Sequence, residues 1–294
     1  MARADASTRI NKLGVRESIA ANAPRITYLS AGSCPVLSIE HATENLYLNS
    51  DTLVTQDITT VADTYTVSFE GTGTITFSGS YSGSLVGGGD GPFNRVSKTF
   101  IATAGTLTST VTGSVNYAQA ENLDYASSYI ATAGTSVTRV ADAITGAGSQ
   151  ALFSSVNSAG CLYAEIAAHS DDGTDRFISI SDGSNANAIR LGFSGSNIFA
   201  DIKVANIAQA TLFNAETVTD YNKVAFKWNE NDFALWINGT EVGTDNSGSI
   251  LPASTLNEIK FSRGDGGSLF YGKTKALYVP EVLTDDELEA LTTP

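Results

Sequence analysis

The sequence predicts an all-β protein, and three observations support this fold class. Apolar and polar residues alternate over many short segments, as in Tyr65-Thr66-Val67-Ser68-Phe69, which is the two-residue period of a strand with one buried face. Glycine-rich breaks separate these segments. The chain also contains 32 Ser, 33 Thr and 27 Gly but six Pro; Thr favours strands, whereas Ser and Gly favour turns. We therefore expect β-sandwiches built from short strands.

The overall composition excludes several classes of protein. A formal net charge of −14 argues against binding to nucleic acid or to an anionic membrane, because both need a basic surface. Hydrophobic residues make up 42% and charged residues 16%, which indicates a folded chain. Two Cys and two His exclude a disulfide framework and a His/Cys-rich metal module. There is no apolar run of membrane-spanning length and no leader-like start, so we expect synthesis in a cytosol and no membrane insertion.

Residues 1–50 show no steady period and are predicted to form an extended N-terminal arm. Pro24 and Pro35 interrupt the segment, and its short apolar runs resemble isolated strands. The first 25 residues carry a charge of +3 ahead of an acidic body. We therefore expect Arg9, Arg16 and Arg25 to contact an acidic neighbouring subunit, with an ordinary solvated tail as the alternative.

Residues 51–142 are predicted to form a jelly-roll-like β-sandwich. Alternating segments occur around residues 65–69, 75–77, 96–101 and 107–111, and glycine-rich stretches separate them. Strands this short and this regularly spaced are typical of sandwiches and jelly rolls. A stretch of small residues at 141–149 then indicates a domain boundary.

Residues 143–294 contain longer strands and are predicted to form a second β-sandwich. Val224 to Ile237 reads as a hairpin with a four-residue loop at 229–232, and Asn238-Gly239 is the preferred dipeptide of a tight hairpin turn. Near the end, Thr284 followed by Glu287 matches a capping box, which predicts one short C-terminal helix.

Two stretches resemble known families. The N-terminal half is similar to the opening of tailed-phage structural proteins, in which a run close to AAN-x-PR precedes LLIE-x-x-x-TNL. The matching residues are 6–11, 14–15, 20–25, 34–40, 43–46, 65–69, 71–76, 125–130 and 132–139. Glu44 stands where that family usually has Arg. The resemblance therefore does not imply that a salt bridge formed by that Arg is present in this chain.

The second resemblance lies in the last third of the chain. Residues 223–228 and 235–239, and then 275–279 and 283–288, look like the late strands of a laminin-G or concanavalin-A-like sandwich found in phage proteins. The two resemblances together imply a virion component of the tail fibre, spike or head-decoration type. They also imply other virion proteins as partners, a homo-oligomer with a trimer as the usual form, host-surface glycans as ligands, and location in the virion after synthesis in the host cytoplasm.

The sequence offers no catalytic constellation. Hydrolases on a concanavalin-like fold need two close carboxylates on one strand face, yet Glu165 is followed two positions later by Ala167. We therefore predict a protein that is not an enzyme and uses no cofactor. The alternatives are a stand-alone carbohydrate-binding lectin and a polysaccharide depolymerase.

Four residues are candidates for ligand binding. Asp171, Asp172 and Asp175 follow His169 in an oxygen-rich segment that could hold Ca²⁺ or could be an ordinary solvated turn, and no metal ligand is assigned. Trp236 has the opposite parity to Leu235 and Ile237. An exposed aromatic ring there would pack on a sugar, whereas a buried ring would belong to the core.

Overall fold

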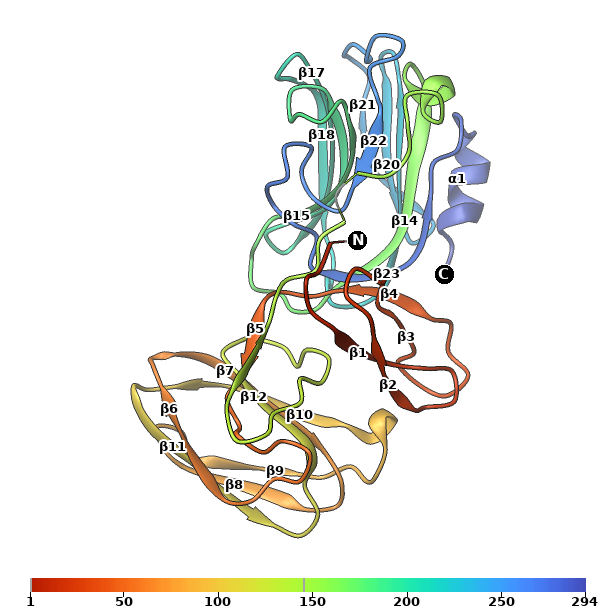
Figure 1. Cartoon of the computed structure of the whole chain (residues 1–294). Helices are drawn as coiled ribbons and strands as arrows, with labels where there is room; N and C mark the ends of the chain where they lie inside the picture. The colour runs from red at the N-terminus through yellow and green to blue at the C-terminus, as the bar shows by residue number, and fades with distance from the viewer. Residues whose placement is uncertain (1, 145) are drawn as a thin grey trace. The chain divides into compact units, whose positions relative to one another are not determined.

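The computed structural model describes residues 2–144 and 146–294, and it confirms the all-β fold class with one short C-terminal helix. The chain divides into two compact units, residues 2–142 and 143–294. Figure 1 labels most of the strands of each unit. No helix in the described residues is long and apolar enough to cross a membrane.

Residues 51–142 form a two-layer sandwich. One sheet has the order β10-β7-β12 and the other β6-β11-β8-β9. Apolar residues from both sheets, including Val67, Phe69, Phe77 and Leu107, form a single buried cluster, because their two-residue period directs them to one face. The strands are β6 (Gln56–Thr60), β7 (Asp63–Glu70), β8 (Thr74–Gly79), β9 (Gly83–Val86), β10 (Val96–Ala102), β11 (Gly105–Thr112) and β12 (Asn116–Glu121), with a 3₁₀ turn at Pro92–Asn94.

Residues 2–50 belong to the same unit and are not a free extended arm. They form short antiparallel pairs, β1 with β2, β3 with β4, and β5 with a strand that follows the sandwich, β13. The sequence shows no steady period here because the strands are only two to four residues long. Several of the side chains buried in this region are charged. The strands are β1 (Ser7–Ile10), β2 (Arg16–Ile19), β3 (Ile26–Thr27), β4 (Val36–Ile39), β5 (Thr43–Asn45) and β13 (Val137–Arg139).

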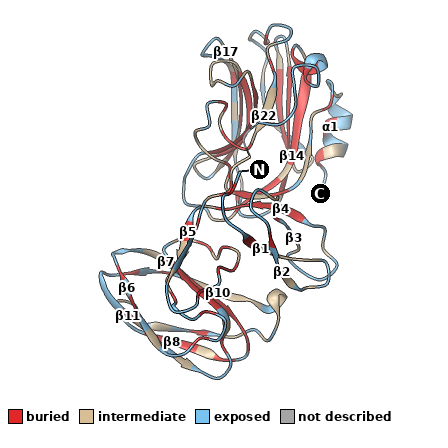
Figure 2. Cartoon of the chain, in the orientation of Figure 1, coloured by how far each residue is buried: buried red, intermediate tan, exposed pale blue. Residues whose placement is uncertain are grey.

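The unit of residues 143–294 is also a two-layer sandwich. The first layer contains β21-β20-β19-β14-β23 and the second β18-β17-β16-β15-β22. Figure 2 shows that β14 is buried along most of its length. The elements are a 3₁₀ turn (Ser154–Val156), β14 (Gly160–Ala168), β15 (Arg176–Ser181), β16 (Ala188–Ser194), β17 (Asn197–Val204), β18 (Ile207–Ala215), β19 (Asn222–Asn229), β20 (Asp232–Ile237), β21 (Thr240–Asp245), β22 (Glu258–Lys260), β23 (Gly272–Tyr278) and α1 (Asp285–Thr292).

Two turns test the local predictions. Asn238 and Gly239 have φ angles of 49° and 82°, which confirms the tight turn, since both positions of such a turn need positive φ. The preceding loop is shorter than predicted. Asn229 pairs directly with Asp232, so two residues, and not four, connect β19 to β20.

The capping box at α1 is confirmed. The Thr284 side chain accepts a hydrogen bond from the Glu287 backbone, and the Glu287 carboxylate accepts one from the Thr284 backbone at 2.8 Å. These two bonds satisfy N–H groups that a helix start leaves without partners. The helix buries Leu288 against the first layer.

Candidate functional site

The candidate site is one face of the sheet β18-β17-β16-β15-β22, which we call the outer face. Ile178, Leu191 and Ile202 of this sheet are fully buried on the core side, so the residues between them point to the opposite side. In the other layer, the corresponding side is covered by α1 (Figure 1). No helix of the described residues lies on the outer face.

An aromatic row crosses the outer face. Phe177 on β15 pairs with Gly192 on β16, Gly192 with Phe199 on β17, and Phe199 with Phe213 on β18. Because Gly192 has no side chain, the rings of Phe177 and Phe199 meet with centroids 5.2 Å apart and a tilt of 49°. Exposure rises along the row, from 3% for Phe177 to 65% for Phe213. The row therefore ends in an open aromatic surface.

A charged pair lies in the next row. Arg190 and Asp201 are opposite each other on β16 and β17, and the Arg190 Nε donates to Asp201 Oδ1 at 2.6 Å while its Nη2 donates to Oδ2. The guanidinium lies 4.9 Å from the centroid of the Phe177 ring and 5.4 Å from that of Phe199. Both side chains are nearly buried. The two parallel hydrogen bonds of this bidentate pair offset the cost of removing both charges from water.

A loop at residues 261–271 covers the β15 half of the outer face. The Ser179 hydroxyl donates to the Ser262 carbonyl at 2.7 Å, and the Phe177 N–H donates to the Ser268 carbonyl at 3.2 Å. Gly264 lies so close that a Cβ there would come within 3.0 Å of the Ser181 side chain. The loop thus forms a wall beside the open β17–β18 half.

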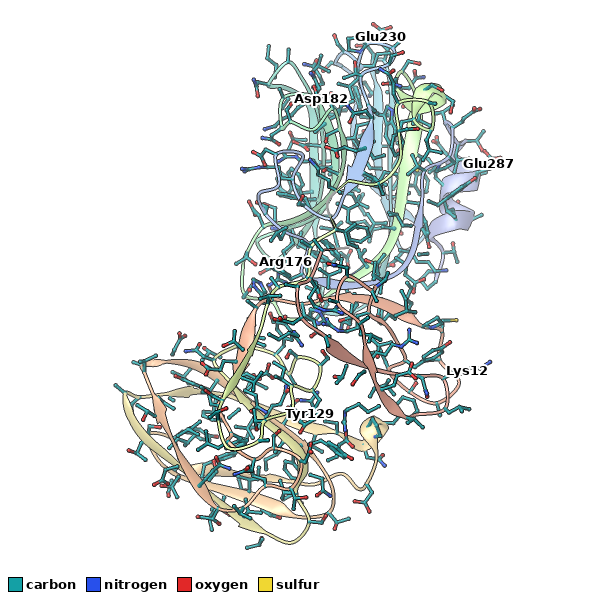
Figure 3. All side chains as sticks on the ribbon, viewed as in Figure 1. Lys12, Tyr129, Arg176, Asp182, Glu230 and Glu287 are labelled. Atoms are coloured by element: carbon teal, nitrogen blue, oxygen red, sulfur yellow. The ribbon has the colours of Figure 1, made fainter. Side chains whose placement is uncertain are left out.

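The predicted acidic residues lie along one side of the aromatic row, the side on which β15 begins. Asp175 precedes β15 and accepts a hydrogen bond from the Ser194 hydroxyl at 2.9 Å, and Asp171 accepts one from the Ser196 hydroxyl at 2.9 Å. Arg176 and Asp182, labelled in Figure 3, mark the two ends of β15, and the acidic residues lie at the Arg176 end. These side chains therefore adjoin the outer face.

Asp172 is engaged in an ion pair. Its carboxylate lies 2.5 Å from the Arg176 guanidinium and accepts hydrogen bonds from the backbone and hydroxyl of Thr174. Burial opposes ionisation, but the Thr174 hydrogen bonds and the nearby Arg176 charge outweigh it, so the pKa of Asp172 is below its ordinary value. Among the described residues, no group of three or more His, Cys, Asp or Glu could hold a metal ion.

Trp236 does not provide an exposed platform. It points to the opposite side from Leu235, as its parity predicts, but α1 covers that side. The ring is 6% exposed and packs in a cluster with Cys161, Tyr163 and Leu288. Of the two alternatives for Trp236, an exposed sugar platform and a buried core residue, the structure has the buried core residue, because α1 covers this side of the sheet.

The three N-terminal arginines have partners within their own unit. Arg25 is fully buried, 2.5 Å from Asp142 and 3.0 Å from Glu40. Arg16 is paired with Glu70 and has a side-chain exposure of 12%. Arg9 is 2.6 Å from Glu17 and about one third exposed. Arg25 and Arg16 are thus internal residues, and Arg9 alone of the three has substantial exposure for a contact with another subunit.

The Arg25 pair is part of a larger buried network. Asp142 also contacts Arg3 at 3.0 Å, and Glu40 also contacts Arg139 at 2.9 Å. Burial lowers the pKa of Arg25 and the Glu40 carboxylate raises it in part. Three of these residues, Arg25, Glu40 and Arg139, belong to the stretches that resemble phage proteins. In this chain they join segments that lie far apart in the sequence.

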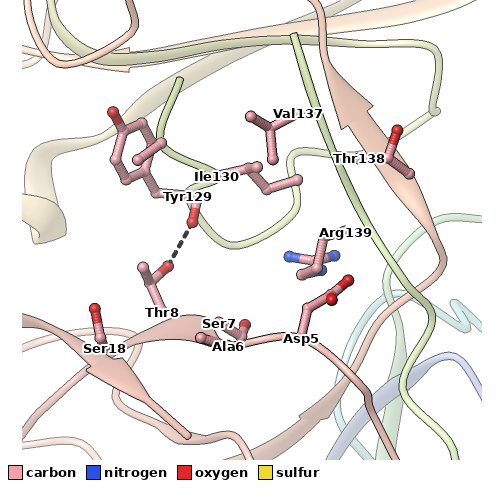
Figure 4. A pocket seen from close by; sticks show the side chains of 11 residues that line it. Asp5, Ala6, Ser7, Thr8, Ser18, Tyr129, Ile130, Val137, Thr138 and Arg139 are labelled. Carbon is pink, nitrogen blue, oxygen red and sulfur yellow. Dashed lines mark hydrogen bonds between the residues drawn. The ribbon is translucent and has the colours of Figure 1, made fainter. Parts of the chain in front are cut away.

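A cavity of about 360 Å³ lies next to this network, between β1 and β13 (Figure 4). Several of the polar side chains that line it have partners within the fold. The Thr8 hydroxyl donates to the Tyr129 carbonyl at 2.7 Å, and the Arg139 guanidinium is bonded to Ser128 and Glu40. Ser7 accepts from Arg25. These groups therefore serve the fold.

Sequence reasoning missed the residues at the centre of the outer face. Phe199 and Asp201 alternate with the buried Ile198, Ala200 and Ile202, so the strand period was visible. The signal that could have identified them is an aromatic and a charged residue at the outward positions of a strand. Their partners on β16 and β18 depend on a register that the sequence alone does not supply.

Comparison with known proteins gives similar structures but no family. No protein-family model matches the chain, and no curated protein matches it. Among solved structures, the chain is similar to the CBM40 module of Ruminococcus gnavus IT-sialidase, with 18% identity over 52% of this chain and 95% of that one and a TM-score of 0.44. A native heptameric SAP-like pentraxin from Limulus polyphemus has 15% identity over 46% and 70%, with a TM-score of 0.37. Domains LG4-5 of the mouse laminin alpha1 chain have 10% identity over 81% and 88%, with a TM-score of 0.35.

Proposed function

We propose that residues 143–294 bind carbohydrate through the outer face, and that the chain does so as a non-enzymatic structural component of a virion. The observation that carries the binding proposal is the aromatic row beside an ion-paired row. Phe213 is 65% exposed and lies opposite Phe199, so it offers a flat apolar surface of the kind that packs on a pyranose ring. Arg190 and Asp201 lie one row away.

The polar groups around the row suit a hydroxyl-rich ligand. Sugar-binding sites combine apolar packing with a few fixed polar groups. Asp175 and Ser194 border one side of the Phe177–Phe213 row, and Arg190 with Asp201 borders the other. The hydrogen bond between Ser194 and Asp175 holds these more exposed groups in place, so a ligand would meet polar groups that are already ordered.

A glycan array with the full chain tests this proposal. We expect binding to a subset of glycans, and we expect Phe213→Ala to remove it. The matched control is Ile207→Ala, because Ile207 lies on the same strand and is equally exposed at 65%. No binding by the unaltered chain, or equal loss in the two variants, would contradict a site at Phe213.

The virion part of the proposal rests on the resemblance in residues 6–139. Arg25 and Arg139 lie in these resembling segments and both contact Glu40, so the segments belong to one folded unit. Mass spectrometry of purified particles tests it. We expect this chain to co-purify with capsid protein. A stand-alone lectin, the leading alternative, would be absent from the particles.

The proposal also states that the chain is not an enzyme. Retaining glycosidases need two free carboxylates about 5–5.5 Å apart, and inverting ones need them somewhat farther apart. On the outer face, Arg190 engages both carboxylate oxygens of Asp201, which supports a binding role. Release of reducing sugar from a host polysaccharide, lost on Asp201→Asn or Asp175→Asn, would favour a depolymerase.

A further inference from the structure

We infer that residues 2–142 contain a second binding site, a cavity beside Tyr117 that takes a neutral, hydroxyl-rich ligand such as one saccharide unit. The cavity has a volume of about 330 Å³, near the lower end of the range for small-molecule sites. Its lining includes Arg16, Glu70, Asp90, Asn116 and Tyr117. None of these residues belongs to the outer face, so the two proposed sites can be tested independently.

The backbone at Tyr117 is strained. Its φ is 50°, a left-handed conformation that is uncommon for a bulky side chain and unfavourable without support. A bulge between Asn116 and Gln119 interrupts the pairing of β12 with β7. Bulges re-aim side chains and are frequent beside functional sites. Here the result is a tyrosine ring that is 39% exposed at the cavity wall.

Arg16 holds the ring in position. Its guanidinium carbon lies 4.0 Å from the Tyr117 ring centroid and 4.8 Å from that of Tyr129. Glu70 pairs with the same guanidinium and has a side-chain exposure of 3%. Burial is the main cause that lowers the pKa of Arg16 to about 10, which still leaves it charged at neutral pH. The aromatic wall is therefore ordered before any ligand arrives.

The cavity lining contains a hydrogen-bond donor and an acceptor with unused capacity. Arg16 uses Nη2 for Glu70, and the structure shows no acceptor among the described residues for its other N–H groups. Likewise, no described residue donates to the Asp90 carboxylate at the rim. A donor and an acceptor in one cavity can bind hydroxyl groups of one sugar, because each hydroxyl both donates and accepts. One cation against two carboxylates disfavours an anionic ligand.

A purely structural role would explain part of this arrangement. The Arg16–Glu70 pair connects β2 to β7, and this alone could be its purpose. It does not explain why the ring that covers Arg16 is placed at a strained position and left partly open. The two roles predict different results when the ring is removed without adding strain, because a structural role affects stability and a binding role affects affinity.

The experiment uses the full chain carrying Phe213→Ala, which silences the outer face. Saturation-transfer NMR with methyl glycosides of glucose, galactose, mannose and N-acetylglucosamine is expected to show binding of at least one. In the same background, Tyr117→Asn is expected to weaken that binding about tenfold. Asn tolerates positive φ, so this variant keeps the backbone. Asp90→Asn should weaken binding as well.

Matched controls separate the outcomes. Tyr278→Asn makes the same replacement at another exposed tyrosine, 56% exposed and outside the cavity, and should leave binding unchanged. No binding of any glycoside at millimolar concentration in the Phe213→Ala chain would overturn the second site without touching the outer-face proposal. Binding that is insensitive to Tyr117→Asn would also overturn it. Tighter binding of sodium acetate than of the glycosides would refute the ligand class.

Discussion

The two units of this protein handle charge in opposite ways. In residues 143–294 the interior between the sheets is largely apolar, as with Phe226 and Trp228, and the buried Arg190–Asp201 pair lies on the outer face. In residues 2–142 a network of charged side chains is itself interior: Arg3, Arg25, Glu40, Arg139 and Asp142 are each at most 4% exposed. The short strands of residues 2–50 bury few large apolar side chains. Ion pairs connect these segments in their place.

This difference predicts different sensitivities to mutation. A buried ion pair contributes little net stability over a well-packed apolar pair, yet removing one partner leaves an uncompensated charge. The stability of residues 2–142 should therefore be most sensitive to mutations that remove buried charges. The stability of residues 143–294 should be most sensitive to mutations that disturb packing. Both tryptophans lie in residues 143–294, so their fluorescence follows that unit, while hydrogen exchange follows each unit in the full chain.

The largest effect is expected for Asp142→Ala. Asp142 accepts from Arg3, Arg25 and the backbone N–H of Glu40, so its loss removes a carboxylate partner from two buried guanidinium groups and leaves Arg25 with Glu40. We expect residues 2–142 to lose about 3–5 kcal/mol of unfolding free energy, measured by hydrogen exchange. Asp57→Ala, on an exposed position of β6, is the control and should change little. Equal effects of the two variants would show that the network is not stabilising.

Gly192→Ala should have the next largest effect, in the other unit. A Cβ at Gly192 would lie 2.0 Å from the Arg176 carbonyl oxygen, so β15 and β16 would have to separate. We expect a loss of about 1–3 kcal/mol, seen as a lower urea midpoint by tryptophan fluorescence. Gly243→Ala is the control, because its nearest neighbour would be Leu212 at an ordinary 3.6 Å. A wild-type midpoint for Gly192→Ala would disprove the close approach.

The fold was more predictable from the sequence than the site was. Period-two alternation identified the strands, and local signals identified the Asn238-Gly239 turn and the Thr284 capping box, because each depends on neighbouring residues. The buried role of Arg25 was not predictable, since its partner Asp142 is 117 positions away. Likewise, Phe199 meets Phe213 only through the β17–β18 register. Trp236 was placed on the correct side of its strand, but its burial depends on where α1 packs.

Thr284→Ala should have a moderate effect on residues 143–294. It removes the hydroxyl that accepts from Glu287, and loss of such a cap costs about 1 kcal/mol. Because α1 covers Trp236, fraying of the helix should also shift tryptophan emission to longer wavelength. Thr219→Ala changes an exposed threonine outside the helix and should leave both readouts as they are. An unshifted spectrum for Thr284→Ala would mean that the cap does not hold α1 in place.

The smallest expected effects concern how the stability of each unit depends on pH, and the dependence has opposite signs for one carboxylate in each unit. The pKa of Asp172 is lowered in the folded chain, so its contribution to stability is present above the ordinary value near 3.8 and disappears as pH falls through the folded value. The stability difference between wild type and Asp172→Asn should therefore shrink towards pH 3, measured by tryptophan fluorescence.

Glu121 should behave in the opposite way. Burial is the main cause that raises its pKa, against hydrogen bonds from Ser127 and the charge of Arg95. A raised pKa stabilises the fold below the ordinary value and loses that effect as pH rises through the folded value. Relative to Glu121→Gln, the wild-type unit of residues 2–142 should therefore become more stable as pH falls, measured by hydrogen exchange corrected for its intrinsic pH dependence. The same sign for Asp172 and Glu121 would mean that the two units do not differ in how they bury carboxylates.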